Sequence, residues 1–108
     1  MSLDQFYTNP KVAERLLSTL EEENPDIWLE PSAGSGSFYN LMPSNKLGYD
    51  LEPKCPGVIQ QDFLTVDLPP DKKIIAVGNP PFGYRAQGAI EFFNACAKQC
   101  YKIAFIIP

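Results

Sequence analysis

Five short apolar runs impose the strongest constraint on the fold of this chain. They are separated by turns and by helical patterns, and they occupy residues 27–30, 46–50, 58–60, 73–78 and 103–107. Short apolar strands that alternate with helical segments are typical of a parallel sheet covered on both faces. The pattern therefore predicts an α/β domain with a mostly parallel sheet and flanking helices. With 108 residues the chain has room for one domain, which we assign to residues 1–108.

Three segments outside these runs are predicted to be helical, one before the first run and two between later runs. The first has apolar residues at helical spacing, with Asn9 as its N-cap, and it ends at Asn24, which precedes a proline. The second covers residues 89–100, and a short helix is predicted for residues 37–42. Helices and strands thus alternate along the chain, as the α/β interpretation requires.

No segment of the sequence has the features of a membrane span or a leader. The apolar runs are far shorter than the roughly 20 residues that cross a bilayer. The N-terminal stretch "MSLDQFYTNP" has neither the basic region nor the apolar region of a signal peptide. We therefore expect a cytoplasmic protein without a membrane partner.

The cysteines and the net charge exclude several classes of function. Three cysteines and no histidine favour neither a complete disulfide framework nor a zinc site, so no metal is expected. Cys96 and Cys100 lie on one helical face, and we interpret them as small buried residues rather than a redox pair. The formal net charge of −4 argues against a complete nucleic-acid-binding surface, because phosphate contacts dominate such binding.

Polar residues follow the predicted strands, at the edge of the sheet where ligands of parallel α/β folds bind. Gly34 and Gly36, in the loop "PSAGSG" of residues 31–36, allow a sharp turn and a close backbone approach to a ligand. Tyr39 occupies the place of the third glycine of a dinucleotide fingerprint. No lysine or arginine lies between residues 27 and 45 to meet a phosphate. The loop is therefore predicted to bind a cationic ligand or one that donates hydrogen bonds.

Two aspartates at strand ends are candidates for contacts with a nucleoside. Asp50 lies 16 residues after Gly34, close to the spacing at which an acid meets ribose hydroxyls. Its alternative interpretation is a solvated aspartate at a strand end. Asp62 could accept a hydrogen bond from an adenine amino group while the ring of Phe63 packs on the base. The alternative for Asp62 is an ordinary turn residue, because aspartate is common in turns without any contact to a ligand.

The stretch "NPPFG" at residues 79–83 follows the most apolar of the runs. Pro80 and Pro81 have no N–H, so nearby carbonyl groups keep acceptor capacity in a fixed direction. The side-chain oxygen of Asn79 adds a second acceptor, and Phe82 adds a flat ring. This combination predicts a receptor for a planar group that carries an amino group.

These segments together resemble the S-adenosylmethionine-dependent amino-methyltransferases, the adenine-specific type with the γ order of motifs. The matching stretches come in the family's order and span nearly the whole chain; they are "DQFYTNPKVA" (4–13), "LEPSAGSGSF" (29–38), "GYDLEP" (48–53), "QQDFL" (60–64), "NPPFG" (79–83) and "IAFIIP" (103–108). The resemblance implies a Rossmann-like methyltransferase fold. The family's closing hairpin and target-recognition region would follow the last stretch, so we expect a sheet truncated after strand five. The fifth strand would then form an edge open to self-association.

The resemblance also implies roles for individual residues. Thr8 and the backbone of Gly34 and Gly36 would hold the methionine part of S-adenosylmethionine, with Asp50 on its ribose. Further contacts with this cofactor are implied for Phe6, Tyr7, Glu30, Pro31, Leu51, Asp62 and Phe63. The catalytic residues would be Asn79, Pro80, Pro81 and Phe82.

The implied activity is methyl transfer to the exocyclic amino group of adenine in DNA. If Asn79 and the Pro80 carbonyl each accept one N–H, the nitrogen lone pair is freed from the ring and can attack the methyl group, while Phe82 stacks on the base. In a duplex the base must first be flipped out. Alternatives are methylation of RNA adenine or protein glutamine, or a truncated cofactor-binding subunit without activity. The N-terminal "DQFYTNP" favours DNA adenine.

Overall fold

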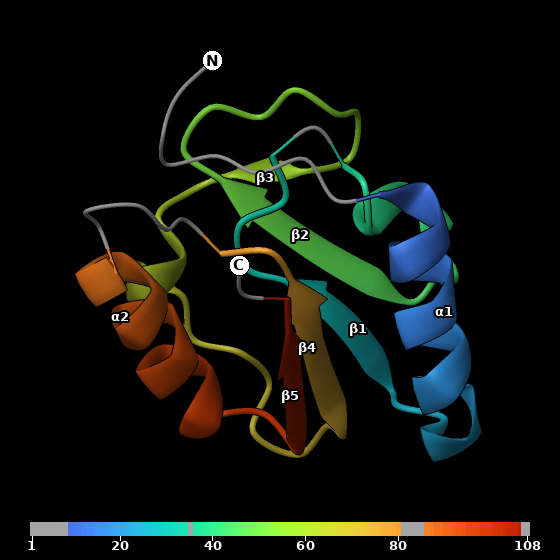
Figure 1. Cartoon of the computed structure of the whole chain (residues 1–108). Coiled ribbons are helices and arrows are strands. Elements are labelled where there is room, and N and C mark those ends of the chain that lie inside the picture. The colour runs from blue at the N-terminus through green and yellow to red at the C-terminus, as the bar shows by residue number, and fades with distance from the viewer. Residues whose placement is uncertain (1–8, 35, 81–85, 107–108) are drawn as a thin grey trace.

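The structure of the chain is a computed structural model, and it describes residues 9–34, 36–80 and 86–106. Two α-helices, five strands and three 3₁₀ turns occur in these ranges (Figure 1). In chain order they are α1 (Pro10–Leu20), η1 (Glu21–Glu23), β1 (Ile27–Glu30), η2 (Tyr39–Leu41), β2 (Lys46–Asp50), β3 (Ile59–Gln60), η3 (Phe63–Thr65), β4 (Ile74–Gly78), α2 (Ala86–Ala97) and β5 (Lys102–Phe105).

The described strands form one parallel sheet in the order β3-β2-β1-β4-β5. This is the order of the first five strands of the doubly wound α/β fold. In the centre of the sheet Leu29 of β1 is in register with Leu47 of β2 and with Ala76 of β4. The predicted α/β class with a parallel sheet and flanking helices is confirmed, and β5 lies at one edge of the sheet.

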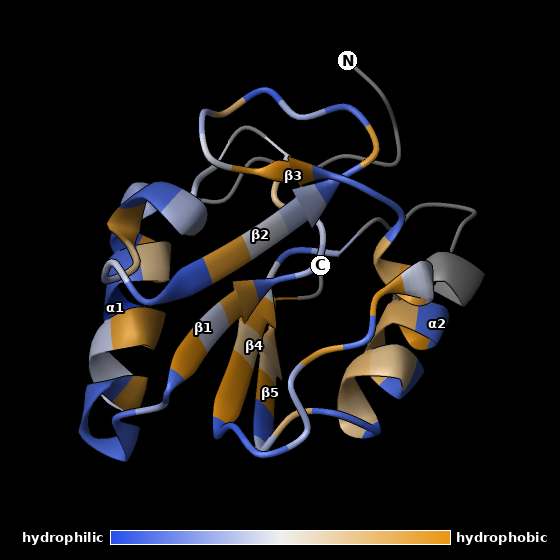
Figure 2. Cartoon of the chain, turned by 180° about the vertical axis from the view of Figure 1, so that it is seen from behind, coloured by the Kyte–Doolittle hydropathy of each residue, from blue (hydrophilic) through white to orange (hydrophobic). Residues whose placement is uncertain are grey.

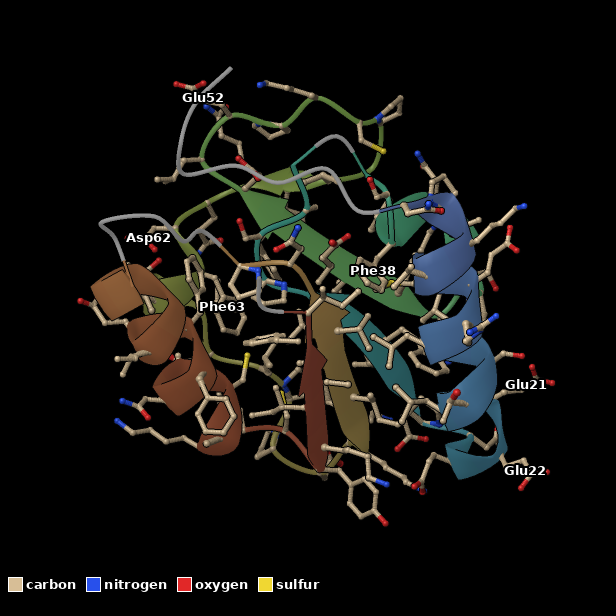
Figure 3. The ribbon with its side chains drawn as sticks, in the orientation of Figure 1. Glu21, Glu22, Phe38, Glu52, Asp62 and Phe63 are labelled. Atoms are coloured by element: carbon tan, nitrogen blue, oxygen red, sulfur yellow. The ribbon has the colours of Figure 1, made fainter. Side chains whose placement is uncertain are left out.

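The sheet is covered on both faces, which explains why β4 has no polar or charged side chain (Figure 2). On one face α1 packs over Trp28, Phe38 and Ile75. On the other face the segment η3 and helix α2 enclose Leu29 and Phe63. Figure 3 shows Phe38 and Phe63 on opposite sides of the sheet. All five residues of β4 are buried.

Several element boundaries differ from the sequence prediction. The helix expected at 37–42 is only the 3₁₀ turn η2, because Pro43 forces Met42 into an extended conformation with ψ 151°. The helix expected at 89–100 is α2, which begins at Ala86 and ends at Ala97. The strands expected at 58–60, 73–78 and 103–107 are shorter or shifted by one or two residues at the ends that the structure describes. Residues 107–108 lie outside the described part.

The two cysteines near the end of α2 are packing residues. Cys96 is fully buried in the core on the α2 side of the sheet, and Cys100 packs against the same cluster. A hydrogen bond with Cys100, together with burial, raises the pKa of the Cys96 thiol, and the same bond lowers the pKa of Cys100. The interpretation of these residues as buried side chains is confirmed for Cys96, while Cys100 is half-buried.

Neither of the described helices combines the length and the apolar character that a membrane crossing requires. The cytoplasmic location remains a prediction from the sequence.

The start of α1 provides a direct test of the helix assignment. Asn9 is extended and its Oδ1 accepts a hydrogen bond of 2.9 Å from the Lys11 N–H, which is otherwise without a helical acceptor. We expect Asn9→Ala to lower the free energy of unfolding by about 0.5–2 kcal/mol. Urea denaturation measures the change. Asn9→Ser keeps a capping oxygen and should stay close to the wild type, and an equal loss in both variants would contradict the capping role.

Candidate functional site

Three polar residues lie at the carboxyl ends of adjacent strands. Glu30 ends β1, Asp50 ends β2 and Asn79 directly follows β4. The chain leaves β1 toward β2 on one side, and it leaves β4 toward α2 and β5 on the other (Figure 1). The carboxyl ends of β1 and β4 therefore form the topological switch point, where open α/β sheets bind their ligands.

Asp50 ties the glycine loop to the end of β2. The loop turns back over the sheet, and the Gly34 N–H donates a hydrogen bond of 2.7 Å to Asp50 Oδ2. The neighbouring Ala33 N–H donates to the Tyr49 carbonyl at 2.9 Å, and Glu52 N–H donates to Asp50 Oδ1 at 2.9 Å. Asp50 is thus more than a solvated aspartate at a strand end. Each carboxylate oxygen has a second lone pair, so a contact with ribose hydroxyls stays a prediction.

Gly36 is held where no other residue fits. Its φ is +91°, a left-handed conformation that favours glycine. A Cβ at this position would lie 2.7 Å from Cys55 Sγ and 2.9 Å from Asn40 Nδ2. Cys55 in turn donates a hydrogen bond of 3.1 Å from Sγ to Asn40 Oδ1. The glycine loop therefore packs against the turn after β2, and no motif in the sequence predicts this contact.

Glu30 is a carboxyl group buried inside the site, with 3% of its surface exposed. Its Oε1 accepts a hydrogen bond of 2.9 Å from the Tyr39 N–H. On its other side it lies against β4, since a Cβ added to Gly78 would be 3.3 Å from Glu30 Cγ. Burial raises the pKa of Glu30 to about 8; the Tyr39 N–H opposes this rise and the charge of Asp50 adds to it. At neutral pH the carboxyl is therefore mostly protonated, and a neighbouring cation would favour its ionised form.

The described contacts of Asp62 and Phe63 lie within the fold: Asp62 has the turn role given as its alternative, and the Phe63 ring belongs to the core. Asp62 Oδ1 accepts a hydrogen bond of 3.0 Å from Leu64 N–H and caps η3, which favours the turn interpretation. The Phe63 ring is 1% exposed and lies in the core near Tyr49 and Phe92, with ring centroids 5.7 and 6.3 Å away (Figure 3). A ring enclosed in this way offers almost no surface to a base. The expected stacking of Phe63 on adenine is not supported here.

The remaining candidate residues divide into those that the structure describes and those that it does not. Pro31 and Pro80 are buried, Asn79 is half-buried, and Leu51 is largely exposed. Phe6, Tyr7, Thr8, Pro81 and Phe82 lie outside the described residues. Within the described ranges, no three histidine, cysteine, aspartate or glutamate side chains are grouped closely enough to hold a metal ion.

A cavity of about 410 Å³ lies away from this edge of the sheet, beside the amino-terminal ends of β1 and β2. It is lined by Leu17, Trp28, Asn45 and neighbouring residues of α1 and the loop before β2. None of the strand-end residues discussed above belongs to its lining. The described residues on which the sequence prediction depends therefore lie at the switch point and not at this cavity.

Comparisons of the chain with protein-family models, with curated proteins and with solved structures found no match. The function must therefore be argued from the residues at the switch point.

Proposed function

We propose that this chain is the S-adenosylmethionine-binding domain of an N-methyltransferase that methylates the exocyclic amino group of adenine in DNA. The observation that supports this most is the juxtaposition at the switch point. Asn79 and Pro80 follow β4 directly, beside the buried carboxyl of Glu30 on β1. The glycine loop bound to Asp50 borders the same edge of the sheet. Hydrogen-bond acceptors for an amino group and carboxyl groups for a cationic cofactor thus lie at the same edge of the sheet.

The acids and the glycine loop suit the chemistry of S-adenosylmethionine. When bound, this cofactor supplies a methyl group activated by a positively charged sulfur. Asp50 provides negative charge, the buried Glu30 carboxyl provides acceptor oxygens and can ionise beside a cation, and no lysine or arginine occurs between residues 27 and 45. A phosphate-bearing ligand would be repelled by such a site, whereas a ligand with a sulfonium, an ammonium and ribose hydroxyls would be favoured.

Asn79 and Pro80 suit the activation of an aromatic amino group. The lone pair of such a nitrogen is delocalised into the ring, which makes it a poor nucleophile. If Asn79 Oδ1 and the Pro80 carbonyl each accept one of its N–H bonds, the nitrogen is drawn toward tetrahedral geometry and its lone pair becomes available. The nitrogen would then bond the methyl carbon as the bond from that carbon to sulfur breaks, a neutral thioether would leave, and the methylated nitrogen would release its surplus proton to water. The chain has no histidine, and this route needs no strong base because it works by positioning and by fixed dipoles.

A methyl-transfer assay tests the proposal and separates possible substrates. The purified chain is incubated with S-adenosylmethionine labelled in its methyl group and with duplex DNA, single-stranded RNA or a mixture of proteins. Label in N6-methyladenine of the DNA supports the proposal. Label in RNA adenine or in protein glutamine would reassign the substrate. If the chain binds the cofactor but labels none of the substrates, it is a cofactor-binding subunit and not an enzyme.

Asp50→Ala tests the cofactor part of the site separately. We expect the free energy of S-adenosylmethionine binding to weaken by about 1–3 kcal/mol, because hydroxyl groups lose their acceptor and the Gly34 N–H loses its partner. Isothermal titration calorimetry measures the change. Glu52→Ala is the matched control, since it removes the same charge from an exposed position two residues away. Unchanged affinity in Asp50→Ala would show that Asp50 contacts no cofactor.

A further inference from the structure

Tyr39 occupies the place of the third glycine of the fingerprint, and two glycines of other elements provide the room for its ring. A Cβ added to Gly48 in β2 would lie 2.6 Å from Tyr39 Cδ1. A Cβ added to Gly57, in the turn before β3, would lie 2.7 Å from the Tyr39 hydroxyl. The ring is 7% exposed. We call the space between Gly48 and Gly57 the tyrosine slot.

Polar contacts fix the same residue from other directions. The Tyr39 carbonyl accepts a hydrogen bond of 2.8 Å from Lys46 Nζ, and this ammonium group lies 4.3 Å from the centre of the ring. The next residue, Asn40, donates from its N–H to the Gly36 carbonyl at 2.9 Å. The turn η2 is therefore anchored to β2 on one side and to the glycine loop on the other.

The consequence of this anchoring lies inside the site. The Tyr39 N–H donates a hydrogen bond of 2.9 Å to Oε1 of the buried Glu30 carboxyl. On the other side Glu30 faces β4 at Gly78, where an added Cβ would lie 3.3 Å from Glu30 Cγ. Any displacement of Tyr39 would withdraw this donor from a carboxyl that is almost completely enclosed.

We propose that Tyr39 is the positioning residue of the switch-point site: the tyrosine slot holds it so that its N–H fixes the Glu30 carboxyl against β4, next to Asn79. This inference rests on the proposed function in one respect, namely that Glu30 serves a cationic cofactor. A large side chain, Tyr39, thus stands where the fingerprint has its third glycine. Small residues are required instead at Gly48 in β2 and at Gly57 in the following turn.

The electrostatic consequence can be stated from the groups that face Glu30. Among the residues that the structure describes, Asp50 on β2 is the charged group that acts on Glu30, β4 contributes uncharged backbone at Gly78, and η2 contributes the Tyr39 N–H. Burial and Asp50 both raise the Glu30 pKa, and the Tyr39 donor opposes them. Loss of that donor should raise the pKa further, above the value of about 8. The carboxyl would then ionise less readily beside a cation and would attract it less strongly.

Gly48→Ala tests the slot. The backbone of Gly48 is not in the left-handed region, so its conformation is compatible with alanine. The obstacle to the new methyl group is therefore the Tyr39 ring. We expect about tenfold weaker S-adenosylmethionine binding in Gly48→Ala, the size of a typical coupling between contacting residues. In a Tyr39→Ala background, Gly48→Ala should have almost no further effect, since the ring is gone. Additive losses in this double-mutant cycle would overturn the proposal.

A second variant and a ligand-free measurement complete the test. Tyr39→Phe keeps the ring in the slot and should retain wild-type affinity, whereas Tyr39→Ala should lose affinity; this comparison decides the question if Gly48→Ala fails to fold. Carbon-13 NMR of the Glu30 carboxyl in the absence of ligand should give a pKa that is higher in Gly48→Ala than in the wild type. A shifted titration in a chain that binds no S-adenosylmethionine would reject the proposed function and retain the positioning role. An unchanged titration would reject the positioning role, whatever the chain binds.

Discussion

Asn79→Ala is expected to abolish detectable methyl transfer and to leave the affinity for S-adenosylmethionine nearly unchanged. The substitution removes the side-chain acceptor that would bind one N–H of the target amino group, directly after the buried strand β4. Loss of a single preorganised hydrogen-bonding group in a catalytic site typically costs about 10²–10³ in kcat. The proposed cofactor contacts come from the ends of β1 and β2 and the loops that follow, so the substitution should leave them in place. Single-turnover transfer of labelled methyl groups and calorimetry measure the two effects separately.

Asn79→Asp provides the control for this prediction. Its carboxylate keeps an oxygen that can accept the N–H, so a measurable rate should remain. Equal loss of transfer and of cofactor affinity in Asn79→Ala would contradict the catalytic role, because it would indicate a residue that supports the site as a whole.

Glu30→Gln is expected to change how the stability of the fold depends on pH. The pKa of Glu30 rises from 4.5 to about 8 on folding, so between these values the native state binds more protons than the unfolded chain. The Glu30 contribution to stability is therefore fully present below about pH 4.5 and is lost as pH rises toward 8. The size of this loss is up to about 5 kcal/mol, a large share of the total stability of a small domain.

The measurement is urea unfolding of the wild type and the variant at pH 5, 7 and 9 under reducing conditions. The glutamine keeps an oxygen for the Tyr39 N–H but does not titrate. The stability of the wild type relative to the variant should therefore fall steadily from pH 5 to pH 9. Glu52→Gln, at an exposed position, should follow the wild type. A difference between wild type and Glu30→Gln that stays constant across this range would show that Glu30 titrates as an ordinary surface carboxyl.

The central part of the fold could be predicted because its signals are local and strong. The segments "IWLE" and "KLGYD" are strands with the predicted bounds, since short apolar runs next to turn residues have few other conformations. Asn9 and Pro10 likewise fixed the start of α1. The ends of α2 were misplaced by three residues because its helical periodicity continues to Cys100, whereas the hydrogen bond from Tyr101 N–H to the Ile74 carbonyl already belongs to the sheet.

The candidate site was predicted only in part, since its supports are contacts between distant segments. The order of Glu30, the glycine loop, Asp50 and Asn79 at strand ends follows from the sequence and the parallel sheet. The hydrogen bond from Tyr39 N–H to Glu30 and the contact of Cys55 with Gly36 depend on how η2 and the turn after β2 fold onto each other. Phe63 was assigned to a base because its motif ends a strand, but the core beneath α2 encloses its ring. The unusual Tyr39 in a glycine position was the one sequence signal of this arrangement.

Equilibrium dialysis of the chain against S-adenosylmethionine labelled in its methyl group tests the central claim most directly. We expect saturable binding of one cofactor per chain, weakened by Asp50→Ala and retained in Glu52→Ala and Asn79→Ala. Absence of saturable binding to the folded wild-type chain would contradict the assignment of the switch point as a cofactor site, and with it the proposed methyl transfer.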